Sequence, residues 1–241
     1  MIPQEIVFKR EPLLVPLNPE PQPVYTYVQP APAPIEQKDY SKLEIDSPIE
    51  TYDVMKKYIQ HLKGVDGLSC EIGLRRGGGT KVIVDTFLSN DDKRVHICVD
   101  PYGNIIYTDI VGPHRSDYTN SMKNETLAEL YSYARDKNVD IIFFNLEDSE
   151  FYRRYCDGVP VYNEDKSYIN NYCFVHIDGQ HENEAVKLAA NFFIPRMSID
   201  GIIIFDNTDH YDHGPTHSLL LNNKFVFLED VLNKKVYKRV L

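Results

Sequence analysis

Short apolar runs alternate with amphipathic helical patterns along most of this chain, and no other feature restricts its fold as strongly. Apolar residues recur at helical spacing in 80–88, 124–137 and 182–193. Strands that alternate with helices in this way form a parallel sheet with helices on both faces. The sequence therefore predicts a doubly wound α/β fold. Its apolar runs are residues 68–74, 95–99, 141–146, 173–177 and 202–205.

The C-terminal tail adds two strands of a different kind. Residues 224–228 and 235–240 have strand character, and the polar stretch 230–233 between them predicts a turn. Together with the five apolar runs, this C-terminal β hairpin predicts a mostly parallel, seven-stranded sheet.

The N-terminal segment differs from everything that follows it. Residues 1–45 contain nine of the fifteen prolines, and the segment 29–34, in which every second residue is proline, cannot form a helix or a central strand. We predict an extended Pro-rich arm at 1–45 and one α/β domain at 46–241. The arm is either a passive leader or a segment that docks on its own domain, on a second copy in a homo-oligomer, or on a protein partner. A helix then follows, with Ser47 as N-cap, Pro48 at its first position and Glu50 at its third.

Composition argues against several classes of partner. The formal net charge of −10 disfavours nucleic acid, because proteins that bind it neutralise phosphates with clustered lysine and arginine. The apolar runs are too short to span a membrane, and the N-terminus lacks the apolar stretch of a secretory signal. Cys70, Cys98 and Cys173 lie inside apolar runs with no CxxC pair, which favours buried core thiols. We expect a cytoplasmic protein.

The first three apolar runs end in residues suited to a cofactor, at the edge where such sheets bind ligands. The first ends in an E-x-G-x-x-x-G loop with Glu71, Gly73 and Gly77, whose glycines allow a tight turn and a close approach to a ligand. The second ends at Asp100, which either accepts both hydroxyls of a ribose or simply begins a turn. The third ends in Asp148 and a serine. Acids at successive strand ends favour a nucleoside-containing cofactor.

A dinucleotide cofactor is disfavoured by the same loop. Its fingerprint is G-x-G-x-x-G, whereas positions 73, 75 and 78 read Gly, Arg and Gly. The missing middle glycine is the one that lets a pyrophosphate approach the backbone. A cofactor without phosphate is therefore favoured over NAD.

The last two apolar runs end in acids that suit a metal. Asp178 follows the fourth run, and Asp206 and Asn207 follow the fifth. Adjacent strand ends bring these three oxygen donors together, and such donors are what magnesium prefers. His181, at the start of the next helix, either caps that helix or takes a proton from a coordinated hydroxyl as a base that titrates in the neutral range.

Three further histidines, His210, His213 and His217, follow within a short loop. Their irregular spacing and the Gly-Pro pair between them favour a substrate-side loop over a zinc site.

Taken together, the E-x-G-x-x-x-G loop, the I-D-G-x-H stretch at 177–181 and the F-D-N stretch at 205–207 resemble known methyltransferases. They are similar to the class I, Rossmann-like enzymes related to macrocin O-methyltransferase and cephalosporin hydroxylase, and more distantly to catechol O-methyltransferase. The resemblance covers roughly residues 65–210. Gly79 departs from it, because relatives often carry a serine there that meets the cofactor carboxylate, and Thr80 is the candidate to replace that contact.

The resemblance implies roles for the strand-end residues. Asp178, Asp206 and Asn207 would hold Mg²⁺ or another divalent cation, and His181 would be the general base. The cofactor would be S-adenosylmethionine, held by Glu71, Gly73, Gly77, Thr80, Asp100, Asp148, Ser149 and Asp178.

The predicted function is metal-dependent methylation of a hydroxyl on a small molecule or sugar, with S-adenosylmethionine as donor. The alternative is a catalytically inactive methyltransferase fold that binds or assembles through its arm. An oxidative enzyme is a third hypothesis, but no iron site of two histidines and a carboxylate is evident.

Overall fold

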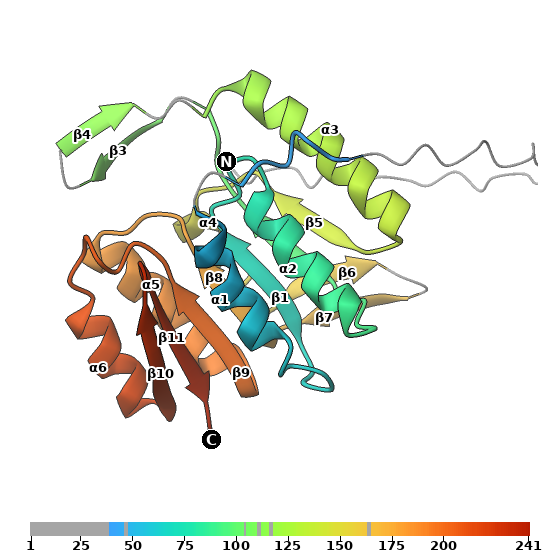
Figure 1. Ribbon diagram of the computed structural model, residues 1–241. Coiled ribbons are helices and arrows are strands. Elements are labelled where there is room, and N and C mark those ends of the chain that lie inside the picture. Colours follow the sequence, from blue (N-terminus) through green and yellow to red (C-terminus); the bar gives the residue numbers. More distant parts are fainter. Residues whose placement is uncertain (1–38, 46–47, 104, 110–111, 116–117, 163–164) are drawn as a thin grey trace, which may run out of the picture. The chain divides into compact units, whose positions relative to one another are not determined.

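A seven-stranded sheet forms the centre of the molecule (Figure 1). The computed structural model describes residues 39–45, 48–103, 105–109, 112–115, 118–162 and 165–241. In spatial order the strands are β10 (Phe225–Val231), β11 (Lys234–Arg239), β9 (Met197–Phe205), β8 (Tyr172–Ile177), β1 (Leu68–Ile72), β2 (His96–Val99) and β5 (Ile141–Phe144).

The strand directions confirm the predicted topology. Strands β9, β8, β1, β2 and β5 pair in parallel, whereas β11 pairs antiparallel with both β9 and β10. The chain winds outward from β1 in one direction through β2 and β5, then returns to β8 on the other side of β1. This reversal is the switch point at which doubly wound sheets open a crevice beyond their carboxyl ends.

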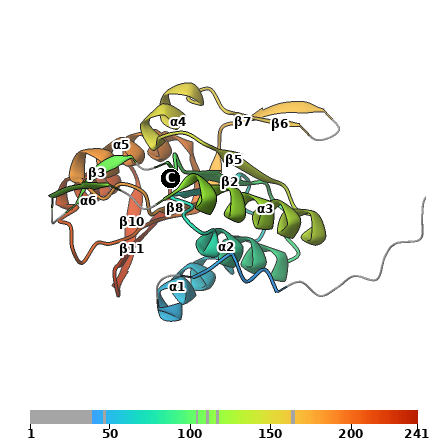
Figure 2. The ribbon, with the colours of Figure 1, turned by 90° about the horizontal axis from the view of Figure 1, so that it is seen from above.

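In the part of the chain that the structure describes, six α-helices pack on the sheet, three on each face. Figure 2 shows helices on both sides of the sheet. Alternate side chains of β9 divide between the faces: Ile203 and Phe205 pack in the core with α5, and Ile202 and Ile204 pack with α1 and α2. One face carries α1 (Ile49–Ile59), α2 (Gly78–Ser89) and α3 (Asn120–Lys137), and the other α4 (Asp148–Arg154), α5 (Asn183–Phe193) and α6 (Gly214–Asn222).

Several local expectations need correction. Helix α1 begins at Ile49, so Pro48 is its N-cap residue and not its first helical residue, and no side chain caps it. The proposed N-cap, Ser47, lies outside the described residues. Helices α4 and α6 were not predicted. The same holds for the short 3₁₀ turn η1 (Ile194–Arg196) and for two hairpins outside the main sheet, β3 (Ile106–Asp109) with β4 (Gly112–Arg115), and β6 (Val159–Tyr162) with β7 (Lys166–Ile169).

The predicted Pro-rich arm falls almost entirely outside the described residues, which begin at Asp39. The last residues assigned to it, 39–45, pack against the α/β domain. Tyr40 and Leu43 are buried, and the Tyr40 hydroxyl donates to Asp136 Oδ2 at 2.7 Å. Docking of the arm on a partner or a second copy stays a prediction. Among the described helices, none is both long and apolar enough to cross a bilayer.

Candidate active site

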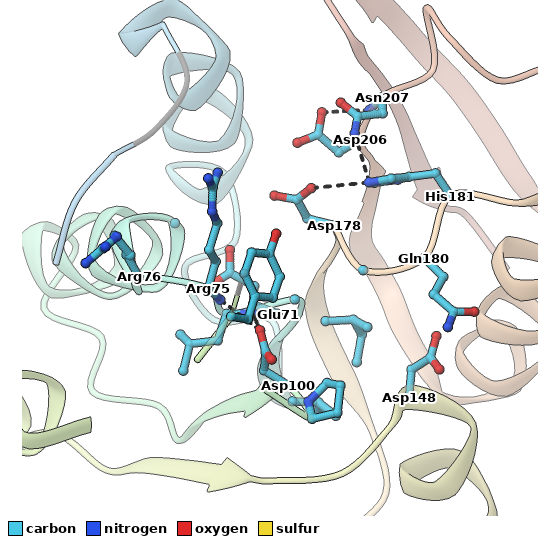
Figure 3. A pocket seen from close by; sticks show the side chains of 18 of the residues that line it. Glu71, Arg75, Arg76, Asp100, Asp148, Asp178, Gln180, His181, Asp206 and Asn207 are labelled. Atoms are coloured by element: carbon cyan, nitrogen blue, oxygen red, sulfur yellow. Dashed lines mark hydrogen bonds and ion pairs between the residues drawn. The ribbon is translucent and has the colours of Figure 1, made fainter. Parts of the chain in front are cut away.

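A pocket of about 390 Å³ opens beyond the carboxyl ends of β1, β2, β8 and β9, at the switch point of the sheet (Figure 3). Three predicted site residues, Gly77, Thr80 and Ser149, are not among those lining it. The predicted residues that do line it are Glu71, Gly73, Asp100, Asp148, Asp178, His181, Asp206 and Asn207.

Gly73 is required by the approach of two strand ends. Its φ is +93°, and a Cβ placed there would lie 2.1 Å from the backbone oxygen of Asp178. The loop after β1 therefore passes directly against the loop after β8. This contact brings the two sides of the pocket together. Glycine at this position thus makes room for the protein's own backbone.

The Asp100 carboxylate organises the glycine-rich loop. Oδ2 accepts from the backbone N–H groups of Leu74 (3.0 Å) and Arg75 (2.9 Å), and Oδ1 accepts from that of Tyr102 (2.8 Å). Burial raises the pKa of Asp100, and the three backbone donors oppose that rise. A carboxylate has about four acceptor positions, so Asp100 can still accept from a ligand.

Glu71 lines the pocket, but its carboxylate is engaged within the protein. Oε2 accepts from the Thr80 hydroxyl at 2.6 Å, and Oε1 lies 3.0 Å from Nδ1 of the buried His176. A Cβ on Gly79 would lie 2.1 Å from Oε1 of Glu71. A side chain at position 79 would therefore have to displace this carboxylate, and Thr80, whose hydroxyl donates to Glu71, is not among the residues that line the pocket.

Lys234, at the start of β11, is a site residue that the sequence analysis missed. Its side chain is 2% exposed, and its Nζ donates to Asp206 Oδ2 at 2.5 Å. Nζ also lies 3.2 Å from His176 Nε2. Because an ammonium only donates, Nε2 accepts, and the Nδ1–H of His176 donates to Glu71. A buried polar chain therefore joins the carboxylates at the ends of β1 and β9.

The Asp206 carboxylate is held from two sides. Oδ2 accepts from Lys234, and Oδ1 accepts from the backbone N–H of Asn207 at 2.8 Å. Burial is the largest single influence and acts to raise the pKa of Asp206, but the charge and hydrogen bond of Lys234, the neighbouring His176 and the Asn207 N–H together outweigh it, so the pKa lies below its usual value. Asp206 is therefore an ionised carboxylate with its counter-charge built into the fold.

His181 lies on the pocket wall between two predicted metal ligands. The amide nitrogen of Asn207 donates to Nε2 at 2.8 Å, and Asp178 Oδ1 lies 3.9 Å from the same nitrogen. The proton is then on Nδ1, which has no hydrogen-bond partner among the described residues. Burial lowers the pKa of His181 to about 4; the negative charge of Asp206 opposes this shift, and His213 adds to it. The neutral-range titration expected from the sequence is wrong for this histidine, because its imidazole is desolvated.

The three histidines after β9 face different partners. His210 lines the pocket and lies 3.5 Å from Asp209 Oδ2. His213 Nε2 donates to the backbone oxygen of His181 at 3.0 Å, whereas His217 Nδ1 lies 2.9 Å from the Tyr237 hydroxyl. Their separate contacts favour the substrate-side loop over a shared zinc ion.

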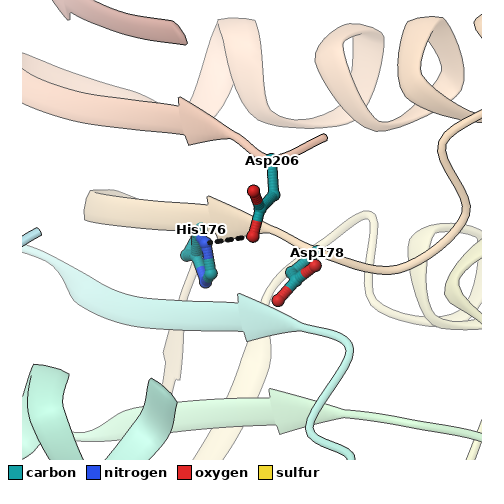
Figure 4. Close-up of side chains that lie close together, drawn as sticks. All are labelled: His176, Asp178 and Asp206. Atoms are coloured by element: carbon teal, nitrogen blue, oxygen red, sulfur yellow. Dashed lines mark ion pairs between the residues drawn. The ribbon is translucent and has the colours of Figure 1, made fainter. Parts of the chain in front are cut away.

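A candidate cation site lies on the β8 and β9 side of the pocket (Figure 4). One ligand atom each from His176, Asp178 and Asp206 lie within 4.8 Å of one another. His176 was not predicted for this role, although it shares a strand face with Asp178, two positions on. Since His176 Nε2 accepts from Lys234, the charged donors that line the pocket are the carboxylates of Asp178 and Asp206, and Asn207, whose amide oxygen accepts from Asn233 at 3.3 Å, lines it beside them. Such a set fits a hard divalent cation.

The strand order and a pocket lined with acids at the switch point define a class I, Rossmann-like methyltransferase fold. The sequence profile of a family described as a methyltransferase domain matches residues 70–208, and the chain belongs to this family. A comparison with curated protein sequences gives no match.

Solved structures with the same fold include several methyltransferases. The O-methyltransferase NovP shares 16% identity with a TM-score of 0.54, covering 80% of this chain and 81% of that one. The calicheamicin methyltransferase CalS11 shares 14% identity with a TM-score of 0.56, covering 79% of each chain. An O-methyltransferase from Bacillus cereus in complex with SAH shares 10% identity with a TM-score of 0.52, covering 81% of this chain and 83% of that one. At these identities the likeness concerns the fold.

Proposed function

We propose that this protein transfers the methyl group of S-adenosylmethionine to a hydroxyl of a small molecule or sugar, assisted by a divalent cation. The observation that carries the proposal is the position of His181. Its unprotonated Nε2 lies on the same pocket wall as the oxygen donors of Asp178, Asp206 and Asn207. A base beside a cation site is what deprotonation of an alcohol requires.

The cofactor side of the pocket is formed by the loops after β1, β2 and β5. We assign the ribose hydroxyls to Asp100, which retains acceptor capacity, and the adenine edge to Asp148. Since Thr80 is turned toward Glu71, a different group must meet the cofactor carboxylate. Arg75 and Arg76 line the same pocket, and we assign this carboxylate to Arg75, which stands two residues after Gly73.

The acceptor side is formed by the segments after β8 and β9. In this proposal the acceptor hydroxyl replaces the Asn207 amide as the donor to His181 Nε2, and the imidazole takes its proton. Asp178, Asp206 and Asn207 would hold the divalent cation, which lowers the pKa of a bound hydroxyl when present. Because burial keeps His181 neutral at physiological pH, the base is ready without a prior loss of a proton.

More specifically, we propose that the chain belongs to the macrocin O-methyltransferase and cephalosporin hydroxylase-like group and that its acceptor is a sugar. It is supported by the I-D-G-x-H and F-D-N stretches and by the fold shared with a structure described as a TDP-rhamnose 3′-O-methyltransferase (13% identity, TM-score 0.50).

Calorimetric titration of the full chain with S-adenosylmethionine and with NAD tests the cofactor assignment. We expect binding of the first and none of the second, and Arg75→Ala should weaken binding while Arg153→Ala, on the exposed end of α4, should not. Methyl transfer to a panel of nucleotide sugars and catechols, with and without Mg²⁺, then tests the reaction. Binding of S-adenosylmethionine without turnover on any acceptor would favour the inactive binding protein, and equal binding of NAD would contradict the proposal.

A further inference from the structure

The Lys234 ammonium lies behind the candidate cation site, opposite its pocket side. Its side chain is as buried as the apolar core, yet it contacts two polar groups, Asp206 Oδ2 at 2.5 Å and His176 Nε2 at 3.2 Å. Those two groups belong to the cluster that would hold a metal ion. The space between His176 and Asp206 is thus already filled by a cation that belongs to the chain.

Asp206 contacts the pocket on one side and the buried Lys234 ammonium on the other. The carboxylate lines the pocket, while Lys234 and His176 do not. An ion that enters from the pocket therefore meets Asp178, Asp206 and Asn207, with Lys234 directly behind Asp206. It does not displace the ammonium, but it shares the same carboxylate.

Charge decides how strongly such an ion is held. Asp178 and Asp206 carry two negative charges and Lys234 one positive charge, which leaves a single net negative charge among these three groups; Glu71 is connected to them only through His176. Affinity of oxygen sites for divalent cations depends on the number of charged ligands. Lys234 also repels an incoming cation through a medium of low dielectric, where charges a few ångströms apart interact strongly.

We propose that Lys234 is the residue that sets the divalent-cation affinity of this site, keeping Asp206 aimed at the pocket while holding the affinity low. The inference rests on the proposed function, and it concerns this chain's own lysine. With Lys234 neutralised, the site gains one net negative charge and binds divalent cations more tightly by about 10- to 100-fold.

The neighbouring residue on β11 supplies a matched control. Lys235 carries the same charge, but its side chain is 24% exposed and pairs with Asp230 at 3.6 Å, away from the pocket. Lys235→Met therefore removes the same charge from the protein as Lys234→Met without touching the site. Any effect of net charge alone would appear in both variants.

The test is direct binding of Mn²⁺ to the full chain, measured as the loss of the free-ion signal in electron paramagnetic resonance, with competition by Mg²⁺. We expect weak binding by the wild type and by Lys235→Met, and binding about 10- to 100-fold tighter by Lys234→Met. Lys234→Gln, which keeps polar groups at the position, should behave like Lys234→Met. The gain should vanish in Lys234→Met combined with Asp206→Asn.

Thermal melting keeps the inference testable if the lysine variants are less stable. Mn²⁺ should raise the melting temperature of Lys234→Met by more than that of the wild type, because the ion replaces the missing counter-charge of Asp206. Unchanged or weaker Mn²⁺ binding in both Lys234 variants, or an equal gain in Lys235→Met, would overturn the inference. S-adenosylmethionine binding, measured on the same samples, reports on the methyltransferase proposal separately, so either can fail alone.

Discussion

Two buried carboxylates, Asp100 at the end of β2 and Asp206 at the end of β9, line opposite sides of one pocket and are held in different ways. Asp100 accepts from three backbone N–H groups and from no described cation. Asp206 accepts from one backbone N–H group and from the buried ammonium of Lys234. Burial raises the pKa of Asp100, whereas the lysine lowers the pKa of Asp206 despite burial.

The difference separates two tasks of the pocket. The backbone donors come from the loops after β1 and β2, to which we assign the cofactor, so in this proposal Asp100 couples the conformation of those loops to cofactor binding. The charged partner of Asp206 is Lys234 on β11, so the position of Asp206 depends on the folding of the C-terminal hairpin. We therefore expect substitutions on the β2 side to change cofactor affinity, and those on the β8 and β9 side to change turnover or stability.

The largest effect is expected for His181→Ala. If the imidazole is the general base, methyl transfer should fall by about 100- to 10,000-fold, the range that such catalysis usually contributes. S-adenosylmethionine affinity should not change, because the cofactor side is untouched. Turnover with a working acceptor and calorimetry on the same variant check both statements. Turnover within a few-fold of the wild type would remove His181 as the base.

Asp206→Ala should produce the next largest effect, on stability. It leaves the buried Lys234 ammonium without its carboxylate, and breaking such a pair costs about 3–5 kcal/mol of unfolding free energy. Asp178→Ala is the matched control, because its side chain is 34% exposed, and it should cost about 1 kcal/mol or less.

Urea unfolding measures both variants of that pair. Adding Lys234→Met to Asp206→Ala should restore much of the lost stability, since a buried pair replaced by apolar groups is often neutral. Equal losses of unfolding free energy in Asp178→Ala and Asp206→Ala would show that burial of the Lys234 ammonium is not stabilised by its ion pair with Asp206.

Asp100→Ala should weaken S-adenosylmethionine binding by about 1–3 kcal/mol, because it removes a charged hydrogen-bond acceptor and frees the glycine loop. Mn²⁺ affinity, set on the other side of the pocket, should stay the same. Calorimetry of both ligands against Asp100→Ala tests whether the two sides are independent. A parallel loss of Mn²⁺ binding would contradict that separation.

Most of the fold could be predicted from the sequence, because its main signals are local. Five strands of the sheet follow from apolar runs bounded by turns, and α2, α3 and α5 from helical periodicity. The C-terminal strands follow from their strand character, although β10 runs to Val231, into the stretch predicted as a turn. Helix α4 and the hairpins β3–β4 and β6–β7 are too short for periodicity to identify. Helix α6 begins in a histidine- and proline-containing stretch that resembles a loop.

The site was predictable only in part, for a related reason. Strand-end acids such as Asp100, Asp178 and Asp206 can be located because topology alone brings strand ends together. Lys234 could not be located in this way, because it stands next to another lysine in a C-terminal strand and a single sequence does not show which of the two is buried. The orientation of Glu71 toward Thr80 and His176 could not be predicted either, because it depends on packing between strands β1 and β8 and helix α2.

The smallest expected effect is that of pH on the base. Burial sets the pKa of His181 at about 4, so the imidazole is neutral, and competent as a base, everywhere above that value. Activity that depends on it is lost only as pH falls through about 4. Between about pH 6 and pH 8, kcat/KM should change by less than about twofold through this group, whereas an exposed histidine would give a clear rise. The profile of kcat/KM, together with ring-proton NMR titration assigned by comparison with His181→Gln, measures this directly. A tenfold rise in rate across the neutral range, matched by titration of the His181 ring, would mean that the ring is open to water and that burial does not set its pKa.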